Sequence, residues 1–130
     1  NLIMNYPDSE YSSYLNESII PVSDPQHKLF LESENIAKYD YIEAIPLYKK
    51  TLNYDKSSFL AAPAAFSIGH YYDQATEIDS ALKYYSLVIN NFPDTDQSKE
   101  AETRISYLNL ILSEINQDST ELLNLKSNWN

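Results

Sequence analysis

Apolar residues recur every three or four positions along most of this chain, which is the spacing of one face of an α-helix. The clearest segment is 79–92, whose apolar stripe consists of Ala81, Leu82, Tyr85, Val88, Ile89 and Phe92. Pro93 follows directly and cannot continue a helix, because it lacks a backbone N–H and clashes with the preceding turn. The pattern therefore predicts a helix of about four turns over 79–92, with Asp79 as its N-cap.

Weaker versions of the same period predict further helices over 9–19, 25–38, 41–54, 58–74 and 97–115. The links between the helices from 25 onward are short, so consecutive helices must run antiparallel as helical hairpins. Pro46 lies inside the predicted helix 41–54 and should bend it or shorten its start. After Pro93, Asp94 and Thr95 are suited to cap the helix that follows.

The last part of the chain departs from this regular pattern. Residues 116–118 are polar and should end the helix 97–115, and the three leucines within 122–125 then suggest a short last helix before a frayed end at Trp129. We expect this last helix to fold back onto helix 97–115 as a cap. Docking on a neighbouring molecule, with weak self-association through the exposed ends of the chain, is the alternative.

An eight-residue phrase occurs twice, as LIMNYPDS from Leu2 and as VINNFPDT from Val88. Internal similarity of this kind indicates a repeated supersecondary unit. The expected organisation is the end of a preceding repeat with a following helix (1–19), a linker (20–25), two repeats (25–58 and 62–95) and a degenerate capping repeat with a tail (96–130). Because Asn1 opens inside what reads as a helix end, we expect a fragment of a longer protein.

The composition favours a folded all-α domain. Of the 130 residues, 43% are hydrophobic and 12 are Tyr, which is too aromatic for a disordered chain. A single Gly and six Pro leave few positions for the tight turns of β-hairpins. No apolar run approaches the roughly 20 residues that a membrane-spanning helix needs, so no membrane insertion by this segment is expected.

Charge and the lack of cysteine exclude several kinds of site. The net charge of −10 repels phosphate backbones, so no nucleic-acid partner is expected. The acidic excess is interpreted as an aid to solubility, with an acidic groove for a basic ligand as the alternative. The chain has no Cys, and His27 and His70 fall on different repeats, so neither a metal site nor a cofactor is predicted.

One set of residues resembles the tetratricopeptide repeat, a 34-residue helix–turn–helix unit: Ile68, Gly69, Tyr72, Ala81, Tyr85, Val88 and Pro93. The resemblance implies a right-handed α-α superhelix of helix hairpins, in which Gly69 and Ala81 allow two helices to cross closely. Residues 62–95 fit the unit well. Residues 25–58 fit less well, because Glu32 stands where a small residue is expected.

The resemblance also implies a concave face lined by the first helix of each pair. The residues expected there to contact a partner are Leu29, Ser33, Ile36, Phe66, His70, Asp73, Glu100, Arg104 and Tyr107. Such a face is typical of a groove for a protein or peptide segment, and an ordinary solvated surface is the alternative. Phe66 and His70 stand where family members that clamp a carboxylate carry Lys and Asn, so a carboxylate clamp is not expected.

The functional hypothesis is a non-enzymatic protein–protein interaction scaffold, part of a larger bacterial protein. The competing hypothesis is a structural spacer or oligomerisation segment with no ligand in its groove. No arrangement of Ser, His and Asp for catalysis can be identified, so no enzymatic activity is predicted. The phrase Tyr/Phe-Pro-Asp-Ser/Thr between helices is similar to repeats of the outer-membrane-assembly lipoprotein and Tol-Pal coordinator type. That similarity implies a periplasmic or outer-membrane-associated location, with the cytoplasm as the alternative.

Overall fold

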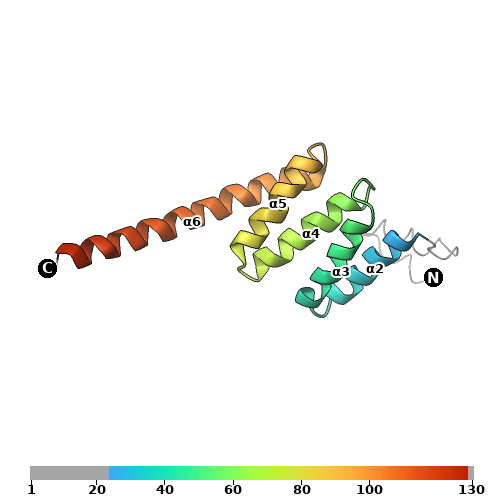
Figure 1. Cartoon of the computed structure of the whole chain (residues 1–130), viewed down its shortest axis with the longest axis horizontal. Coiled ribbons are helices and arrows are strands. Elements are labelled where there is room, and N and C mark those ends of the chain that lie inside the picture. Colours follow the sequence, from blue (N-terminus) through green and yellow to red (C-terminus); the bar gives the residue numbers. More distant parts are fainter. Residues whose placement is uncertain (1–23, 129–130) are drawn as a thin grey trace, which may run out of the picture.

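The computed structural model describes residues 24–128, and in this range the chain folds into helices joined by short connections, without a strand. The helices are α2 (Pro25–Ala37), α3 (Tyr41–Tyr54), α4 (Ala61–Gln74), α5 (Ile78–Asn91) and α6 (Asp96–Asn128). They lie side by side in the order of the chain, and the second half of α6 extends away from the others (Figure 1). The prediction of an all-α fold is confirmed for these residues.

Local sequence explains most of the helix boundaries. Asp40 accepts hydrogen bonds from the backbone N–H groups of Ile42 and Glu43 at the start of α3. Thr95 accepts one from the N–H of Ser98 at the start of α6, as its position after Pro93 predicted. The predicted N-cap of α5 was wrong by two residues, because Glu77 is the N-cap and Asp79 lies in the first turn.

The predicted start of α4 at residue 58 was also too early. Ser58 and the residues after it form a turn, in which the Ser58 hydroxyl accepts a hydrogen bond from the Leu60 N–H, and the helix begins at Ala61. Pro63 is then the third helical residue, where its missing N–H has no partner to lose within the helix. Pro46 does not shorten α3, which begins at Tyr41 as predicted, and a bend at Pro46 stays a prediction.

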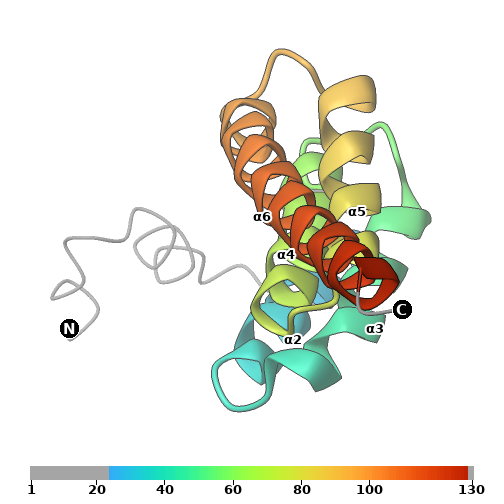
Figure 2. The same ribbon diagram turned by 90° about the vertical axis from the view of Figure 1, so that its left-hand side faces the viewer.

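The core is formed where each helix packs on the next, with α4 in the middle of the row. Its buried face is made almost entirely of small residues, with only Ile68 as a large side chain: Ala61, Ala62, Ala64, Ala65, Ile68 and Gly69. Small residues let the neighbouring helices approach α4 closely, and the large buried side chains Tyr48 of α3 and Tyr85 of α5 fill the space on its two sides. α4 also contacts α6, which starts beside α5 and crosses in front of α4 in the view of Figure 2.

The only glycine of the chain sits at one of these close approaches. A Cβ on Gly69 would lie 2.9 Å from Cδ1 and 3.1 Å from Cε1 of the Tyr85 ring. Both atoms belong to a fully buried side chain that has no room to move. Gly69 is therefore required by packing, at the position where the sequence predicted a close crossing with the helix that carries Ala81.

The end of the chain contradicts the sequence prediction. Residues 116–118 do not end a helix at 115, and α6 continues without interruption to Asn128. Asn, Gln and Asp are only moderately unfavourable inside a helix, so three polar residues without Gly or Pro do not stop one. Because α6 has no turn, residues 122–125 do not fold back onto its first half, and the predicted self-cap was wrong.

Several predictions concern residues outside the described range. They are the first copy of the repeated phrase at Leu2, the helix 9–19, most of the linker 20–25 and the frayed end at Trp129. Among the helices of residues 24–128, none is both long and apolar enough to cross a membrane.

Candidate functional site: a hollow between α4 and α6

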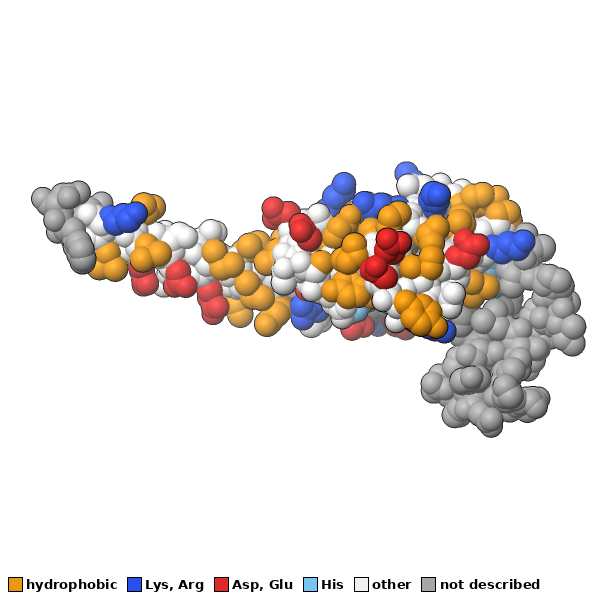
Figure 3. Space-filling view, turned by 90° about the horizontal axis from the view of Figure 1, so that it is seen from below, with side chains coloured by type: hydrophobic (Ala, Val, Ile, Leu, Met, Phe, Trp, Pro, Cys, Tyr) orange, Lys and Arg blue, Asp and Glu red, His pale blue; other side chains and the backbone are white. Residues whose placement is uncertain are grey.

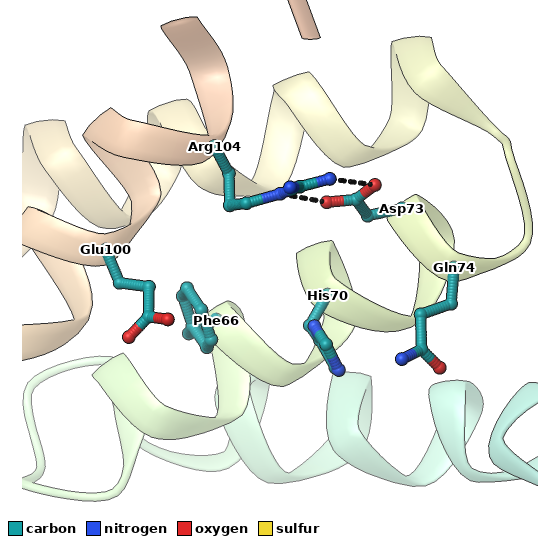
Figure 4. Close-up of a pocket in the computed structure, with 6 residues that line it drawn as sticks. All are labelled: Phe66, His70, Asp73, Gln74, Glu100 and Arg104. Carbon is teal, nitrogen blue, oxygen red and sulfur yellow. Dashed lines mark hydrogen bonds and ion pairs between the residues drawn. The ribbon is translucent and has the colours of Figure 1, made fainter. Parts of the chain in front are cut away.

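A hollow of about 350 Å³ lies between α4 and the first half of α6. It is lined by Phe66, His70, Asp73 and Gln74 from α4 and by Glu100 and Arg104 from α6. In Figure 4, Asp73 points toward Arg104 of α6, and Phe66, His70 and Gln74 follow one another along α4. Their spacing explains this arrangement, because residues three or four positions apart share one face of a helix.

The two walls of the hollow are tied together by the ion pair between Asp73 and Arg104. The guanidinium donates from Nε to Oδ2 of Asp73 over 2.8 Å and from Nη2 to Oδ1 over 3.0 Å (Figure 4). The Tyr85 hydroxyl of α5 donates to the same Oδ2 over 2.8 Å. Three helices thus converge on one carboxylate, which is only 11% exposed.

This network sets the charge states of its members. Burial by itself would raise the pKa of Asp73, but the hydrogen bonds from Arg104 and Tyr85, together with the positive charge of Arg104, lower the pKa below its usual value. The hydrogen bond to Asp73 raises the pKa of Arg104. Burial, and then the hydrogen bond to Asp73, raise the pKa of the Tyr85 hydroxyl. The carboxylate therefore stays ionised and its charge is neutralised within the site.

Aromatic rings form the apolar part of the wall. The rings of Phe66 and His70 lie nearly parallel, with an interplanar angle of 10° and 6.2 Å between their centroids. Phe66 also contacts the Tyr85 ring, at a centroid distance of 5.6 Å. Because Tyr85 is fully buried, Phe66 is supported from behind by the core while it remains half-buried itself. A supported ring of this kind is a rigid surface for an apolar or flat group.

Polar groups complete the rim of the hollow. Glu100 and Gln74 are exposed, and Glu100 has no ion-pair partner among the described residues. Asp73 and Arg104 neutralise each other, so Glu100 carries the charge that the hollow offers to a ligand. Gln74 was not predicted from the sequence. The signal was present, because Gln74 continues the four-residue spacing of Phe66 and His70 along α4.

The hollow brings together five of the nine residues predicted to contact a partner: Phe66, His70, Asp73, Glu100 and Arg104. Tyr107 lies one turn further along α6 and is 50% exposed, and the Arg104 guanidinium lies 4.8 Å from the centroid of its ring. Arg104 therefore connects the hollow to Tyr107. These six residues occupy adjoining positions on α4 and α6, although they are up to 41 positions apart, from 66 to 107, in the chain.

The three residues predicted on α2 do not join this site. Ser33 is fully buried, where its hydroxyl donates to the Leu29 carbonyl oxygen and lies 3.5 Å from Oγ1 of Thr51. Its prediction as a contact residue was wrong, because α2 presents Ser33 to α3 and not to solvent. Ile36 is half-buried and packs against the core, and Leu29 is half-buried. None of the three lines the hollow.

The two carboxylates of the hollow differ in their surroundings. Asp73 accepts three hydrogen bonds from Arg104 and Tyr85, which lowers its basicity, and Glu100 is exposed. Within residues 24–128, no three His, Asp or Glu side chains are grouped closely enough to hold a metal ion. Comparison of the chain with protein-family models, with curated proteins and with solved structures finds no match.

Proposed function

We propose that the chain is a protein–protein interaction scaffold built from tetratricopeptide-like helix pairs, and that it binds a protein or peptide segment across α4 and α6. The observation that carries the proposal is the convergence of six predicted contact residues on one open surface between two helices. Helix pairs of similar length, α2–α3 and α4–α5, and the close approach of Gly69 to Tyr85 support the resemblance to the repeat.

The surface is suited to a peptide because it is rigid and chemically mixed. The Asp73–Arg104 pair fixes the distance between α4 and α6, so little ordering is needed when a ligand binds. Phe66 and Tyr107 supply aromatic area, and Glu100 and Gln74 supply exposed polar groups on either side of it. Aromatic anchors surrounded by polar groups are typical of the energetically important part of a protein interface.

The absence of a catalytic role is part of the proposal. An enzyme needs a nucleophile or a base within hydrogen-bond reach of its substrate, and a group that positions it. In the hollow, the hydrogen bonds and the ion pair of Asp73 are satisfied within the protein, which leaves Glu100 and His70 as titratable groups on different walls. The further proposal of a bacterial cell-envelope location rests only on the sequence similarity, with the cytoplasm as the alternative.

A structural spacer or oligomerisation segment is the second candidate. The observation that favours it is the second half of α6, which extends away from the other helices and carries several exposed leucines (Figure 1). The two candidates differ in whether the hollow between α4 and α6 binds anything.

Selection from a displayed library of random peptides tests the proposal. We expect selection on the intact chain to yield peptides with a shared sequence pattern. Phe66→Ala and Tyr107→Ala should weaken the binding of these peptides by roughly tenfold each, because each removes an aromatic anchor worth about 1–2 kcal/mol. Phe59→Ala is the matched control, since Phe59 is 79% exposed in the connection before α4 and lies outside the hollow.

Two results would contradict the proposal. One is a selection that enriches no common pattern. The other is a set of peptides that bind the Phe66→Ala and Tyr107→Ala variants as tightly as the parent. Circular dichroism of each variant establishes that it is folded, which matters for Phe66 because its ring contacts Tyr85.

A further inference from the structure

The second half of α6 lacks the packing that supports the other helices. Ile111 still packs against the core and Leu112 is half-buried, but every side chain from Ser113 to Lys126 is exposed. Figure 1 shows this part of α6 extending beyond the ends of α4 and α5. A single helix of this length is only marginally stable in water, because most helical stability in proteins comes from the packing of an apolar face. The structure therefore presents a helix that lacks a neighbour within residues 24–128.

The apolar face of this part continues the face that α6 buries against the other helices. Leu108 is 2% exposed and Ile111 packs against the core, and the same three- and four-residue spacing leads on to Ile115, Leu122 and Leu125, which are 50%, 62% and 54% exposed. Alternating steps of three and four residues are the signature of a seam between two helices that pack along their length. The first part of this apolar face is therefore buried within the fold, and the second part is exposed.

Acidic residues lie in this seam and along one edge of it. Glu114, Asp118 and Glu121 are spaced four and three residues apart, so their side chains form a row, and hydrophobic side chains lie beside acidic ones along this helix (Figure 3). None of the three has an ion-pair partner among the described residues. Like charges at this spacing destabilise a helix, and a neighbour with positive charges would remove that cost.

Asp118 also occupies a position of the seam itself, midway in the steps from Ile115 to Leu122. A second copy of the chain would place this carboxylate against an apolar residue or against another Asp118, either of which is costly for a charge removed from water. In an antiparallel pair of copies the acidic rows would face each other. In a parallel pair two helix stacks, each of a chain with net charge −10, would lie at the same end. A helix with Lys or Arg at the facing position has none of these costs.

We propose that residues 112–126 of α6 are a docking surface for an amphipathic helix of basic character. Its apolar side packs on Ile115, Leu122 and Leu125, and its Lys or Arg residues pair with Asp118 in the seam and with Glu114 and Glu121 along the edge. The surface is separate from the hollow between α4 and α6, so the inference goes beyond the proposed function and does not depend on it. A single ionised residue within an apolar seam selects the partner in this way at some cost in affinity.

Two synthetic helices of about four turns test the proposal. Both carry leucine along one seam; the first has Lys at the facing and flanking positions, and the second has Glu at the same positions. We expect calorimetry to show that the intact chain binds the Lys peptide. The Glu peptide should bind at least about tenfold more weakly, because like charges would then face each other across the contact. Binding of the Lys peptide should weaken as salt is added.

Charge-matched variants distinguish the effect of the acidic row Glu114, Asp118 and Glu121 from the effect of the protein's overall negative charge. The variant Glu114→Lys, Asp118→Lys, Glu121→Lys should lose the Lys peptide. The control Glu32→Lys, Asp94→Lys, Glu102→Lys changes the net charge equally at exposed positions outside the row and should keep it. Leu122→Ser should weaken binding while leaving the thermal unfolding midpoint unchanged, because its side chain is 62% exposed and does not belong to the core of the described residues.

Four results would overturn the proposal. The first is that the Lys peptide does not bind at all. The second is that both peptides bind equally, which would mean that apolar contact alone is recognised. The control variant could lose as much affinity as the row variant, which would mean that only the overall field attracts the peptide. Finally, sedimentation could show that the intact chain self-associates and that Leu122→Ser abolishes the association, which would assign the surface to a second copy.

Discussion

The helix pairs α2–α3 and α4–α5 bury equivalent residues in their second helices, but they differ in the contacts that surround these residues. Ala44 and Ala81 are fully buried at the same place in α3 and α5, and each is followed four residues later by a fully buried tyrosine, Tyr48 or Tyr85. Each tyrosine hydroxyl donates to a carboxylate of the preceding helix, Glu34 over 2.6 Å in the first pair and Asp73 over 2.8 Å in the second. A phenol–carboxylate hydrogen bond thus joins both hairpins.

The pairs differ in what happens to that carboxylate. Asp73 receives two further hydrogen bonds from Arg104 of α6, which brings a third helix to the network and forms one wall of the hollow. Among the described residues, Glu34 has no such ion pair. The arrangement shared by the two pairs therefore does not by itself create the hollow. The hollow depends on one arginine that the next helix contributes.

The crossings of the two pairs differ as well. Gly69 lets the Tyr85 ring approach the backbone of α4, whereas α2 carries Glu32 at the corresponding place of the sequence and leaves it exposed. In the first pair the close contact is made one residue later, by the hydroxyls of Ser33 and Thr51, which are both fully buried. The side of α2 that faces α3 is therefore offset from the side that the repeat pattern predicted.

Replacement of the glycine should produce the largest effect on this comparison. We expect Gly69→Leu to lower the free energy of unfolding by about 1–3 kcal/mol or more, because even its Cβ would overlap the buried Tyr85 ring. The matched change Glu32→Leu should stay within about 0.5 kcal/mol, since Glu32 is exposed. Urea unfolding measures both, and equal losses in the two variants would contradict the proposed difference between the crossings.

Removal of the two carboxylates should give a smaller but unequal effect. Asp73→Ala takes the acceptor from Tyr85 and Arg104 together, and we expect a loss of about 1–3 kcal/mol in unfolding free energy. Glu34→Ala takes the acceptor from Tyr48 alone, so a loss of about 1 kcal/mol is expected. Chemical denaturation of both variants gives the two values. A larger loss for Glu34→Ala would show that the arginine contributes nothing to the second pair.

The lowered pKa of Asp73 predicts how its contribution varies with pH. A carboxyl group whose pKa is lower in the folded state stabilises the protein above its unfolded pKa of about 3.9, and this stabilisation is lost as pH falls through the folded pKa. The intact chain should therefore exceed Asp73→Asn in stability at neutral pH, and the difference should shrink in acid. Thermal unfolding of both proteins between neutral and acidic pH measures this, and a difference that stays constant would rule out the ion pair as its source.

The smallest effect is expected when the Ser33 hydroxyl is removed from the polar crossing of the first pair. Ser33 and Thr51 each donate to a carbonyl oxygen four residues earlier, so neither hydroxyl depends on the other for a partner. We expect Ser33→Ala to change the unfolding free energy by no more than about 1 kcal/mol. Ser33→Leu should cost about as much as Gly69→Leu, because Ser33 is fully buried against α3. If Ser33→Leu is as stable as the parent, α2 can rotate so that position 33 no longer faces α3, as the sequence analysis predicted.

Most of the helices followed from the sequence because their causes are local. The period of apolar residues placed α3 and α5 to within one residue at either end, apart from the choice of cap before α5, and Pro93 ended α5 where a proline must. The same reasoning failed at residues 116–118. Polarity indicates a surface, but only Gly or Pro would have indicated a break in the helix.

Five of the six residues that line the hollow were named from the sequence, because the resemblance to the tetratricopeptide repeat implies that the first helix of each pair lines a concave face. The ion pair of Asp73 with Arg104 was not predicted, since the two residues are 31 positions apart and only the packing of α6 beside α4 brings them together. The burial of Ser33 was missed for a related reason. Which face a helix turns inward depends on the side chains of its neighbour.

The sequence by itself determined that the described residues are helical and where their hairpins turn. These are properties of short segments, set by backbone sterics and by the spacing of apolar residues. The tertiary structure alone decided that α2 contributes Ser33 to the core, that Arg104 closes the hollow and that α6 extends past its last packing partner. Those features depend on contacts between segments distant in the chain. The residue pattern of a single helix does not determine the free energy of such contacts.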